Sequence, residues 1–209
     1  MVEQSKIPVI KHYTGNCHTY VHADADPRMA VELCVNAKTQ RTGVCNATET
    51  FLLHRDTLRS GLAQQIATAL LDAGVTLHAD ADSRGALTDH ERLIPATEAD
   101  WDTEYLSMDA ALRVIDGIPD AADHINRHGS RHTDAIVTSS LAAAEAFTQR
   151  VDTANVMVNC STRFSDGEQY GLGAEIGIST DKLHARGPMG AADLTTYQWI
   201  AQGSGHIRK

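Results

Sequence analysis

The stretch LRVIDGIPDAADHINRHGSRHTDAIVTSSLAAAEAFTQRVDTANVMVNC, residues 112–160, carries the clearest fold signal in this sequence. Its runs LRVID, DAIVT and ANVMVNC are typical of strands, and the two amphipathic segments between them are typical of helices. Pro119 and Gly129 mark the start and the end of the first helix. Strands that alternate with helices are usually parallel and joined by crossovers. We therefore predict an α/β domain with a mostly parallel sheet.

The residues before this stretch continue the same alternation. Four short runs predict further strands: IPVI (7–10), HTYVH (18–22), TFLLH (50–54) and VTLHA (75–79). Asp26 and Pro27 predict the start of a helix, as its N-cap and its first residue. One long helix that ends near Gly74 is predicted by a single apolar stripe: Leu58, Leu62, Ile66 and Leu70. After residue 160, interleaved glycines and apolar residues predict ordered loops around short strands.

Composition limits the classes of partner. The chain has 209 residues, of which 42% are hydrophobic and 22% charged, as in ordinary globular proteins. No run approaches the ~20 apolar residues that span a membrane. A net charge of −9 disfavours binding to nucleic acid or to an anionic membrane, because both require clustered Lys and Arg. The start, MVEQSKIPVI, resembles no signal peptide, so we expect a cytoplasmic protein with a small-molecule substrate.

The four cysteines include no CxxC pair and are expected to be free thiols: Cys17, Cys34, Cys45 and Cys160. Cys45 lies in NAKTQRTGVCNATET, between a predicted helix and a predicted strand. The cations of Lys38 and Arg41 could lower the pKa of its thiol and make it a nucleophile. The alternative is that Cys45 is a small buried apolar residue.

Histidine spacing gives no metal site. His124, His128 and His132 are four residues apart, but Gly129 is expected to end the helix before His132. A hydrolase of the Cys–His type would need a histidine beside Cys45, and no spacing selects one of the eleven. Arg163 and Arg186 lie in loops with hydroxyl and backbone donors, which suits carboxylate or phosphate recognition, although such arginines often form surface ion pairs.

Four long words resemble one known family in the expected order: IPVIKHYTGNCHTYV, NAKTQRTGVCNATET, VNCSTRFSDGEQYGLGAEIGIST and KLHARGPMGAADLTTYQWI. They are similar to gamma-glutamyl phosphate reductases, members of the aldehyde dehydrogenase superfamily. The resemblance implies a three-layer catalytic domain in which Cys45 is the nucleophile. It also implies that Ser161, Thr162 and Arg163, with Arg41, bind substrate, and that Glu104 contacts the cofactor NADPH. Thr42 and Cys160 depart from the family pattern, which commonly has Pro and a small residue there.

Members of that family are about twice as long, so the resemblance implies a C-terminal half. Residues 1–22 would then be the last strands of a truncated nucleotide-binding domain. Residues 23–160 would be the catalytic thiol domain, and 161–209 the substrate loop and an oligomerisation segment that forms a dimer or larger assembly. The implied activity is NADPH-dependent reduction of gamma-glutamyl phosphate in proline biosynthesis, by a full-length parent. The alternatives are a non-catalytic isolated domain and part of a bifunctional kinase–reductase.

Overall fold

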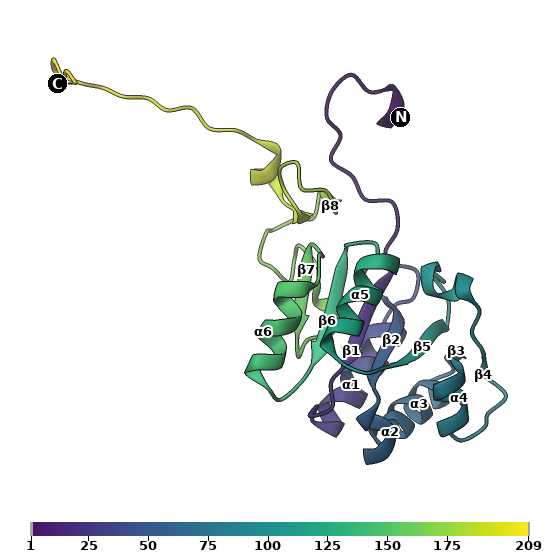
Figure 1. Ribbon diagram of the computed structural model, residues 1–209. Helices are drawn as coiled ribbons and strands as arrows, with labels where there is room; N and C mark the ends of the chain where they lie inside the picture. Colours follow the sequence, from purple (N-terminus) through teal and green to yellow (C-terminus); the bar gives the residue numbers. More distant parts are fainter. Residues whose placement is uncertain (1, 209) are drawn as a thin grey trace.

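A parallel seven-stranded sheet forms the centre of the molecule in the computed structural model, which describes residues 2–208 (Figure 1). The strand order is β4-β3-β5-β2-β1-β6-β7, and every neighbouring pair is parallel. The strands are β1 (Cys17–Val21), β2 (Thr48–His54), β3 (Thr76–Ala79), β4 (Leu93–Pro95), β5 (Asp109–Ile115), β6 (Thr133–Val137) and β7 (Asn155–Val158). The predicted α/β fold with a mostly parallel sheet is confirmed.

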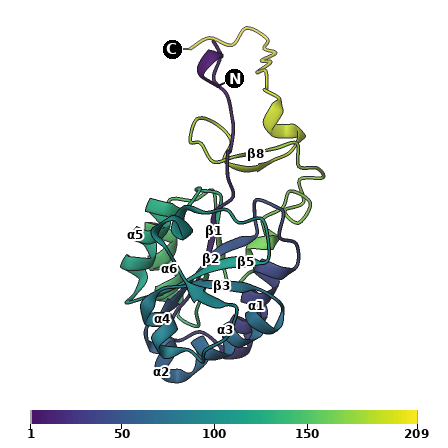
Figure 2. The same ribbon diagram turned by 90° about the vertical axis from the view of Figure 1, so that its right-hand side faces the viewer.

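Helices cover both faces of this sheet and give three layers (Figure 2). The α-helices are α1 (Pro27–Thr39), α2 (Asp56–Ser60), α3 (Leu62–Asp72), α4 (Ala81–Ala86), α5 (Ile118–His128) and α6 (Leu141–Arg150). Short 3₁₀ turns lie at Val2–Gln4, Glu98–Asp102, Thr162–Phe164 and Ala191–Leu194. Among the described residues no helix has the length and apolar character needed to cross a membrane.

Two apolar cores lie on opposite faces of the sheet because alternate strand residues point to opposite sides. Phe51 of β2 packs with α1 and α3, whereas its neighbour Leu52 packs with α5 and α6. Both side chains are fully buried. Burial of both faces explains why the strands are apolar along most of their length rather than alternating with polar residues.

Local signals placed several helix ends correctly. The carboxylate of Asp26 accepts a hydrogen bond from the backbone N–H of Met29 at 2.8 Å, and Pro27 is the first residue of α1. At the end of α3, Gly74 has a φ of +93° and its N–H donates to the carbonyl of Leu71.

Two predicted elements are wrong. The long helix is broken into α2 and α3 at Gly61, where a φ of +80° interrupts the helical path. Residues 7–10 form no strand; they belong to an extended segment that leads into β1. No strand pairs with them, and an isolated run cannot form a ladder whatever its propensity.

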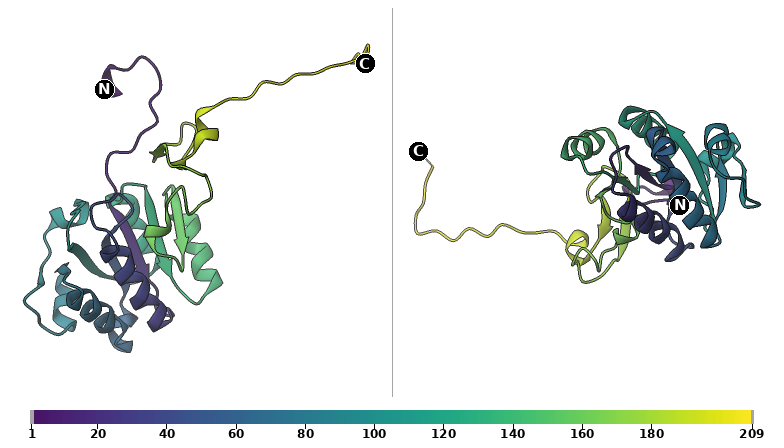
Figure 3. Two further views of the ribbon diagram at one scale, coloured as in Figure 1. Left: turned by 180° about the vertical axis from the view of Figure 1, so that it is seen from behind. Right: turned by 90° about the horizontal axis from the view of Figure 1, so that it is seen from below.

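The expected division after residue 22 is not a boundary between sheets. β1 lies between β2 and β6 and pairs with both, so it belongs to the same sheet as the strands that follow it. The hairpin of β8 (Gly177–Ser179) and β9 (Gly187–Met189) lies outside this sheet. The N-terminal segment and the C-terminal segment both extend from the same end of the domain (Figures 1 and 3).

Candidate functional site

Cys45 lies in the turn between α1 and β2, at the end of the sheet where the parallel strands begin. Its side chain is partly exposed, whereas the turn beneath it is buried from Asn46 onward. The backbone carbonyl of Cys45 accepts a hydrogen bond from the thiol of Cys17 at 3.1 Å. The start of β1 therefore supports the turn that carries Cys45.

Gly15, which lies just before β1, packs against the same turn. A β-carbon built on Gly15 would lie 2.1 Å from the carbonyl oxygen of Cys45, which is too close for any other residue. The N–H of Gly15 donates to Oε1 of Glu104 at 2.8 Å. Glu104, the residue expected to contact the cofactor, is thus held beside Cys45, and its carboxylate is already a hydrogen-bond acceptor within the chain.

The electrostatics at Cys45 differ from the expectation. Burial raises the pKa of the Cys45 thiol, the charge of Glu175 raises it further, and Arg163 lowers it only in part. Lys38, expected to be a nearby cation, points into the interior instead. Its Nζ lies 2.5 Å from Oε2 of Glu49, and both side chains are completely buried. Lys38 is therefore not available as a cation beside Cys45.

Arg163 lies near Cys45 and near Arg41, because the charges of both act on its guanidinium. Burial, followed by the charge of Arg41, lowers the pKa of Arg163. Nε of Arg163 donates to Oε1 of Gln40 at 2.8 Å. The guanidinium lines a pocket of about 510 Å³ together with Ser161 and Cys160. Two neighbouring guanidiniums with one amide partner are suited to an anion.

In the loop that carries Arg163, the side chains of Ser161 and Thr162 have different environments. The hydroxyl of Ser161 caps the 3₁₀ turn by accepting from the N–H of Arg163, and it lines the pocket. Thr162 is fully buried, and its hydroxyl lies 3.0 Å from that of Thr48 on β2. The Thr162 side chain therefore holds the loop on the sheet, and its hydroxyl already has a partner within the chain.

Two histidines lie beside Cys45: His12, which the sequence did not single out, and His132, which it offered only as the third member of a row with His124 and His128. Ligand atoms of His12, Cys45 and His132 all lie within 4.8 Å of one another. The imidazole rings of His12 and His132 meet edge to face, with centroids 5.6 Å apart. Burial lowers the pKa of His132 to about 4, so its ring is neutral at pH 7. No spacing could have found this group, because the three residues are far apart in the sequence.

α5 ends at His128, and Gly129 follows as its cap, so His132 does not continue the helical row of His124 and His128.

Arg186 is an ion-pair residue: its Nη2 lies 2.9 Å from Oδ1 of Asp152, which Lys182 also contacts. The alternative interpretation of Arg186 as a surface ion-pair residue is therefore the correct one.

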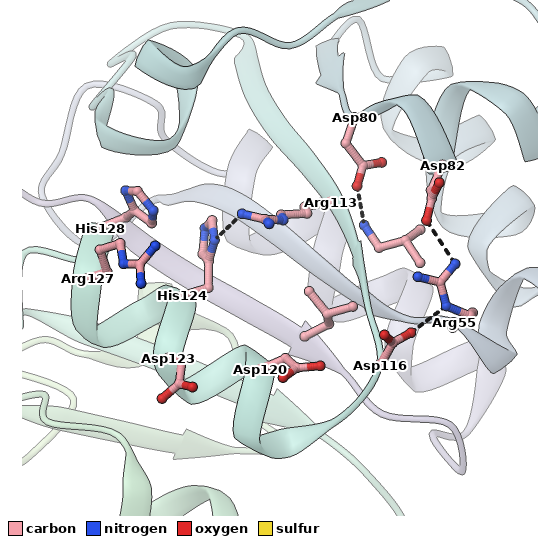
Figure 4. Close-up of a pocket in the computed structure, with 12 residues that line it drawn as sticks. Arg55, Asp80, Asp82, Arg113, Asp116, Asp120, Asp123, His124, Arg127 and His128 are labelled. Carbon is pink, nitrogen blue, oxygen red and sulfur yellow. Dashed lines mark hydrogen bonds and ion pairs between the residues drawn. The ribbon is translucent and has the colours of Figure 1, made fainter.

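A charged pocket of about 390 Å³ lies at the opposite edge of the sheet, where β2, β3 and β5 end (Figure 4). Some of its polar side chains are paired within the chain. Arg55 bonds to Asp82 at 2.8 Å and also contacts Asp116, and Nη1 of Arg113 lies 3.0 Å from Nδ1 of His124. Because Cys45 lies at the starting edge of the strands, this pocket is not part of its site.

No protein-family profile matches this chain. It is 52% identical over 208 residues to a gamma-glutamyl phosphate reductase of Clavibacter michiganensis subsp. michiganensis, covering 100% of this chain and 47% of that protein. It is 51% identical over 208 residues to the Thermobifida fusca protein of the same name, covering 100% of this chain and 49% of the relative. The chain thus spans about half the length of the curated relatives it matches.

Solved structures give the same relationship. The gamma-glutamyl phosphate reductase of Thermotoga maritima superimposes with a TM-score of 0.91 at 40% identity, covering 99% of this chain and 49% of that one. An acetylating aldehyde dehydrogenase of Geobacillus thermoglucosidasius has a TM-score of 0.74 at 15% identity, over 99% of this chain and 54% of that one. The latter likeness shows a shared aldehyde-dehydrogenase-like fold.

Proposed function

Because this chain is a homologue of gamma-glutamyl phosphate reductases over its whole length, we propose that it is the thiol-bearing catalytic part of such an enzyme. The whole enzyme would use NADPH to reduce gamma-glutamyl phosphate to glutamate 5-semialdehyde and phosphate. This reaction would be a step of proline biosynthesis in the cytoplasm. The observation that carries the proposal is the placement of Cys45. It lies partly exposed in a turn at a sheet edge, with Arg163 and Arg41 close by.

The first chemical step would be acyl transfer to sulfur. The Cys45 thiolate would attack the acyl carbon of gamma-glutamyl phosphate and form a carbon–sulfur bond. The carbon–oxygen bond to phosphate would break, and inorganic phosphate would leave with the bonding electrons. The backbone N–H of Cys45 would donate to the developing oxyanion. Arg163 and Arg41 would hold an anionic end of the substrate, since a guanidinium binds phosphate or carboxylate in a bidentate manner.

The cofactor is supported only in part by the residues present. NADPH would supply the hydride that reduces the acyl group on sulfur. The described residues show no Gly-rich turn between a strand and a helix N-terminus of the kind that cradles a pyrophosphate. Glu104 is the one side chain here proposed to reach the cofactor, and it already accepts from Gly15. Cofactor binding would therefore depend on the portion of the relatives that this chain does not cover, and the isolated chain would turn over no substrate.

Association with a second subunit is part of the same proposal. Residues 195–208 run away from the domain, and in the part of the chain that the structure describes they do not pack against it (Figure 3). They carry large apolar side chains that are mostly exposed, among them Tyr197, Trp199 and Ile200. Contiguous exposed apolar groups of this kind are typical of interfaces. We propose that this segment packs against another subunit in at least a dimer.

The test uses a chimera, in which this sequence replaces the matching residues of the Thermobifida fusca relative. NADP⁺ reduction is followed with glutamate 5-semialdehyde and phosphate, the reverse reaction. The chimera should be active, its Cys45→Ser variant should lose activity by orders of magnitude, and His184→Gln, at an exposed position outside the pocket of Arg163, should remain active. A folded Cys45→Ser chimera with normal turnover would exclude Cys45 as the nucleophile.

A further inference from the structure

His12, Cys45 and His132 are brought together by the strand order. Each residue precedes a strand: His12 precedes β1, Cys45 precedes β2, and His132 directly precedes β6. β1 lies between β2 and β6 in a parallel sheet, so the three strand starts are neighbours at one edge. One ligand atom from each side chain then falls within 4.8 Å of the others. Two imidazole nitrogens and one thiol sulfur are a donor set that zinc prefers.

His132 is the buried member of the group, and hydrogen bonds determine which of its ring nitrogens carries the lone pair. His132 is completely buried, and its Nδ1 lies 2.8 Å from Oγ1 of Thr133. The Thr133 hydroxyl is placed to donate to Oγ of Ser165 at 2.9 Å, which leaves its oxygen able to accept from Nδ1–H of His132. Nε2 of His132 then carries the lone pair, and among the described residues it has no hydrogen-bond partner. This is the arrangement in which a second residue fixes the tautomer of a metal-binding histidine.

The other two members are accessible. His12 and Cys45 are both partly exposed, so an ion can reach the group from solvent and retain a water as its fourth ligand.

We propose that His12, Cys45 and His132 form a zinc-binding site that reversibly blocks the Cys45 thiol. On binding, the thiol proton is released to solvent, and the sulfur forms a bond to Zn²⁺. A sulfur bound to the ion is no longer free to attack a carbon electrophile. This site is independent of the proposed reductase activity, since it needs only the three side chains of this chain.

Binding is tested directly on the 209-residue chain with Zn²⁺ and with Co²⁺ as a coloured substitute. Calorimetry should show one zinc ion per chain, and cobalt should give thiolate-to-metal charge-transfer absorption. Cys45→Ser should abolish that absorption, and His12→Gln and His132→Gln should each weaken zinc binding at least about 10-fold. Circular dichroism verifies that each variant is folded. His12→Gln, at a partly exposed position, keeps the test valid if the buried His132 variant unfolds.

Matched controls use groups outside the site. Cys160→Ser and His184→Gln, both at exposed positions, should leave binding unchanged. In a separate measurement, zinc should slow iodoacetamide alkylation of Cys45, mapped by peptide analysis, without slowing that of Cys160. Zinc affinity that is unaffected by Cys45→Ser and by His12→Gln would overturn the proposal, as would equal alkylation of Cys45 with and without the ion.

Discussion

The α-carbon of Gly15 is packed directly on the backbone of Cys45. A β-carbon on Gly15 would lie 2.1 Å from the carbonyl oxygen of Cys45 and 2.3 Å from its α-carbon. Backbone atoms cannot move aside as a flexible side chain can. The segment before β1 therefore fixes the position of the turn that carries the thiol.

Gly15→Ala should displace the turn of Cys45. Overpacking of a tight backbone contact typically costs about 1–3 kcal/mol in the free energy of unfolding. We expect a loss in this range, measured by urea denaturation, together with a changed alkylation rate at Cys45. Gly43→Ala is the matched control two residues from Cys45, because its β-carbon would meet no atom within 4 Å. Equal effects of the two substitutions would contradict the proposed contact.

Glu175→Gln should make Cys45 more reactive. The carboxylate of Glu175 is the largest charge effect that raises the pKa of the thiol, so its neutralisation should lower that pKa and increase the thiolate fraction near neutral pH. Glutamine can still accept the hydrogen bond from the N–H of Gly167. The alkylation rate of Cys45 is measured against pH in a Cys160→Ser background, which removes the exposed thiol.

Arg163→Gln is the opposite case for the same assay. Arg163 lowers the pKa of Cys45, so its removal should slow alkylation near neutral pH. If both substitutions shift the rate in the same direction, the electrostatic explanation is wrong.

Breaking the buried ion pair of Lys38 and Glu49 should lower the free energy of unfolding much more than replacing both residues by apolar ones. Burial raises the pKa of Glu49 to about 7, and Lys38 opposes that shift. Lys38→Met leaves the carboxyl group without its partner in the interior and should cost about 3–5 kcal/mol of unfolding free energy. The double variant Lys38→Met with Glu49→Leu should recover most of that loss. Urea denaturation of the two single variants and the double variant checks this, and additive losses would count against it.

His124 should make the protein less stable in acid. Burial, followed by the charges of His18 and Arg113, lowers the pKa of His124 to about 2. In the unfolded chain an ordinary histidine pKa is about 6.5, so below that pH the unfolded state binds a proton that the folded state does not. Stability contributed by the neutral ring is therefore complete above pH ~6.5 and falls by at most about 1.4 kcal/mol per pH unit below it.

His124→Gln should flatten this dependence. Urea unfolding at pH 7, 6 and 5 measures the slope for the wild type and the variant. His184→Gln, at an exposed position, should keep the wild-type slope. An unchanged slope in the His124 variant would show that its ring is protonated in the folded protein.

The sequence by itself determined the class of the fold and several element ends. Strand and helix periodicity act over a few residues, as does the cap of Asp26 on the N–H of Met29, so they can be predicted locally. The position of Cys45 in a turn also followed from its place between a predicted helix and a predicted strand. Propensity alone failed at residues 7–10, because a strand needs a partner to pair with.

Only the tertiary structure decided what surrounds Cys45. His12 and His132 reach it because β1 lies between β2 and β6, an order that no local pattern encodes. Glu104 is held there by the N–H of Gly15, far from it in the sequence. The packing of α1 on β2 placed Lys38 against Glu49 in the interior rather than beside the thiol. The pKa of Cys45 is raised rather than lowered because of burial and of carboxylates that lie far from it in the sequence. Both effects depend on distance in space and not on separation along the chain.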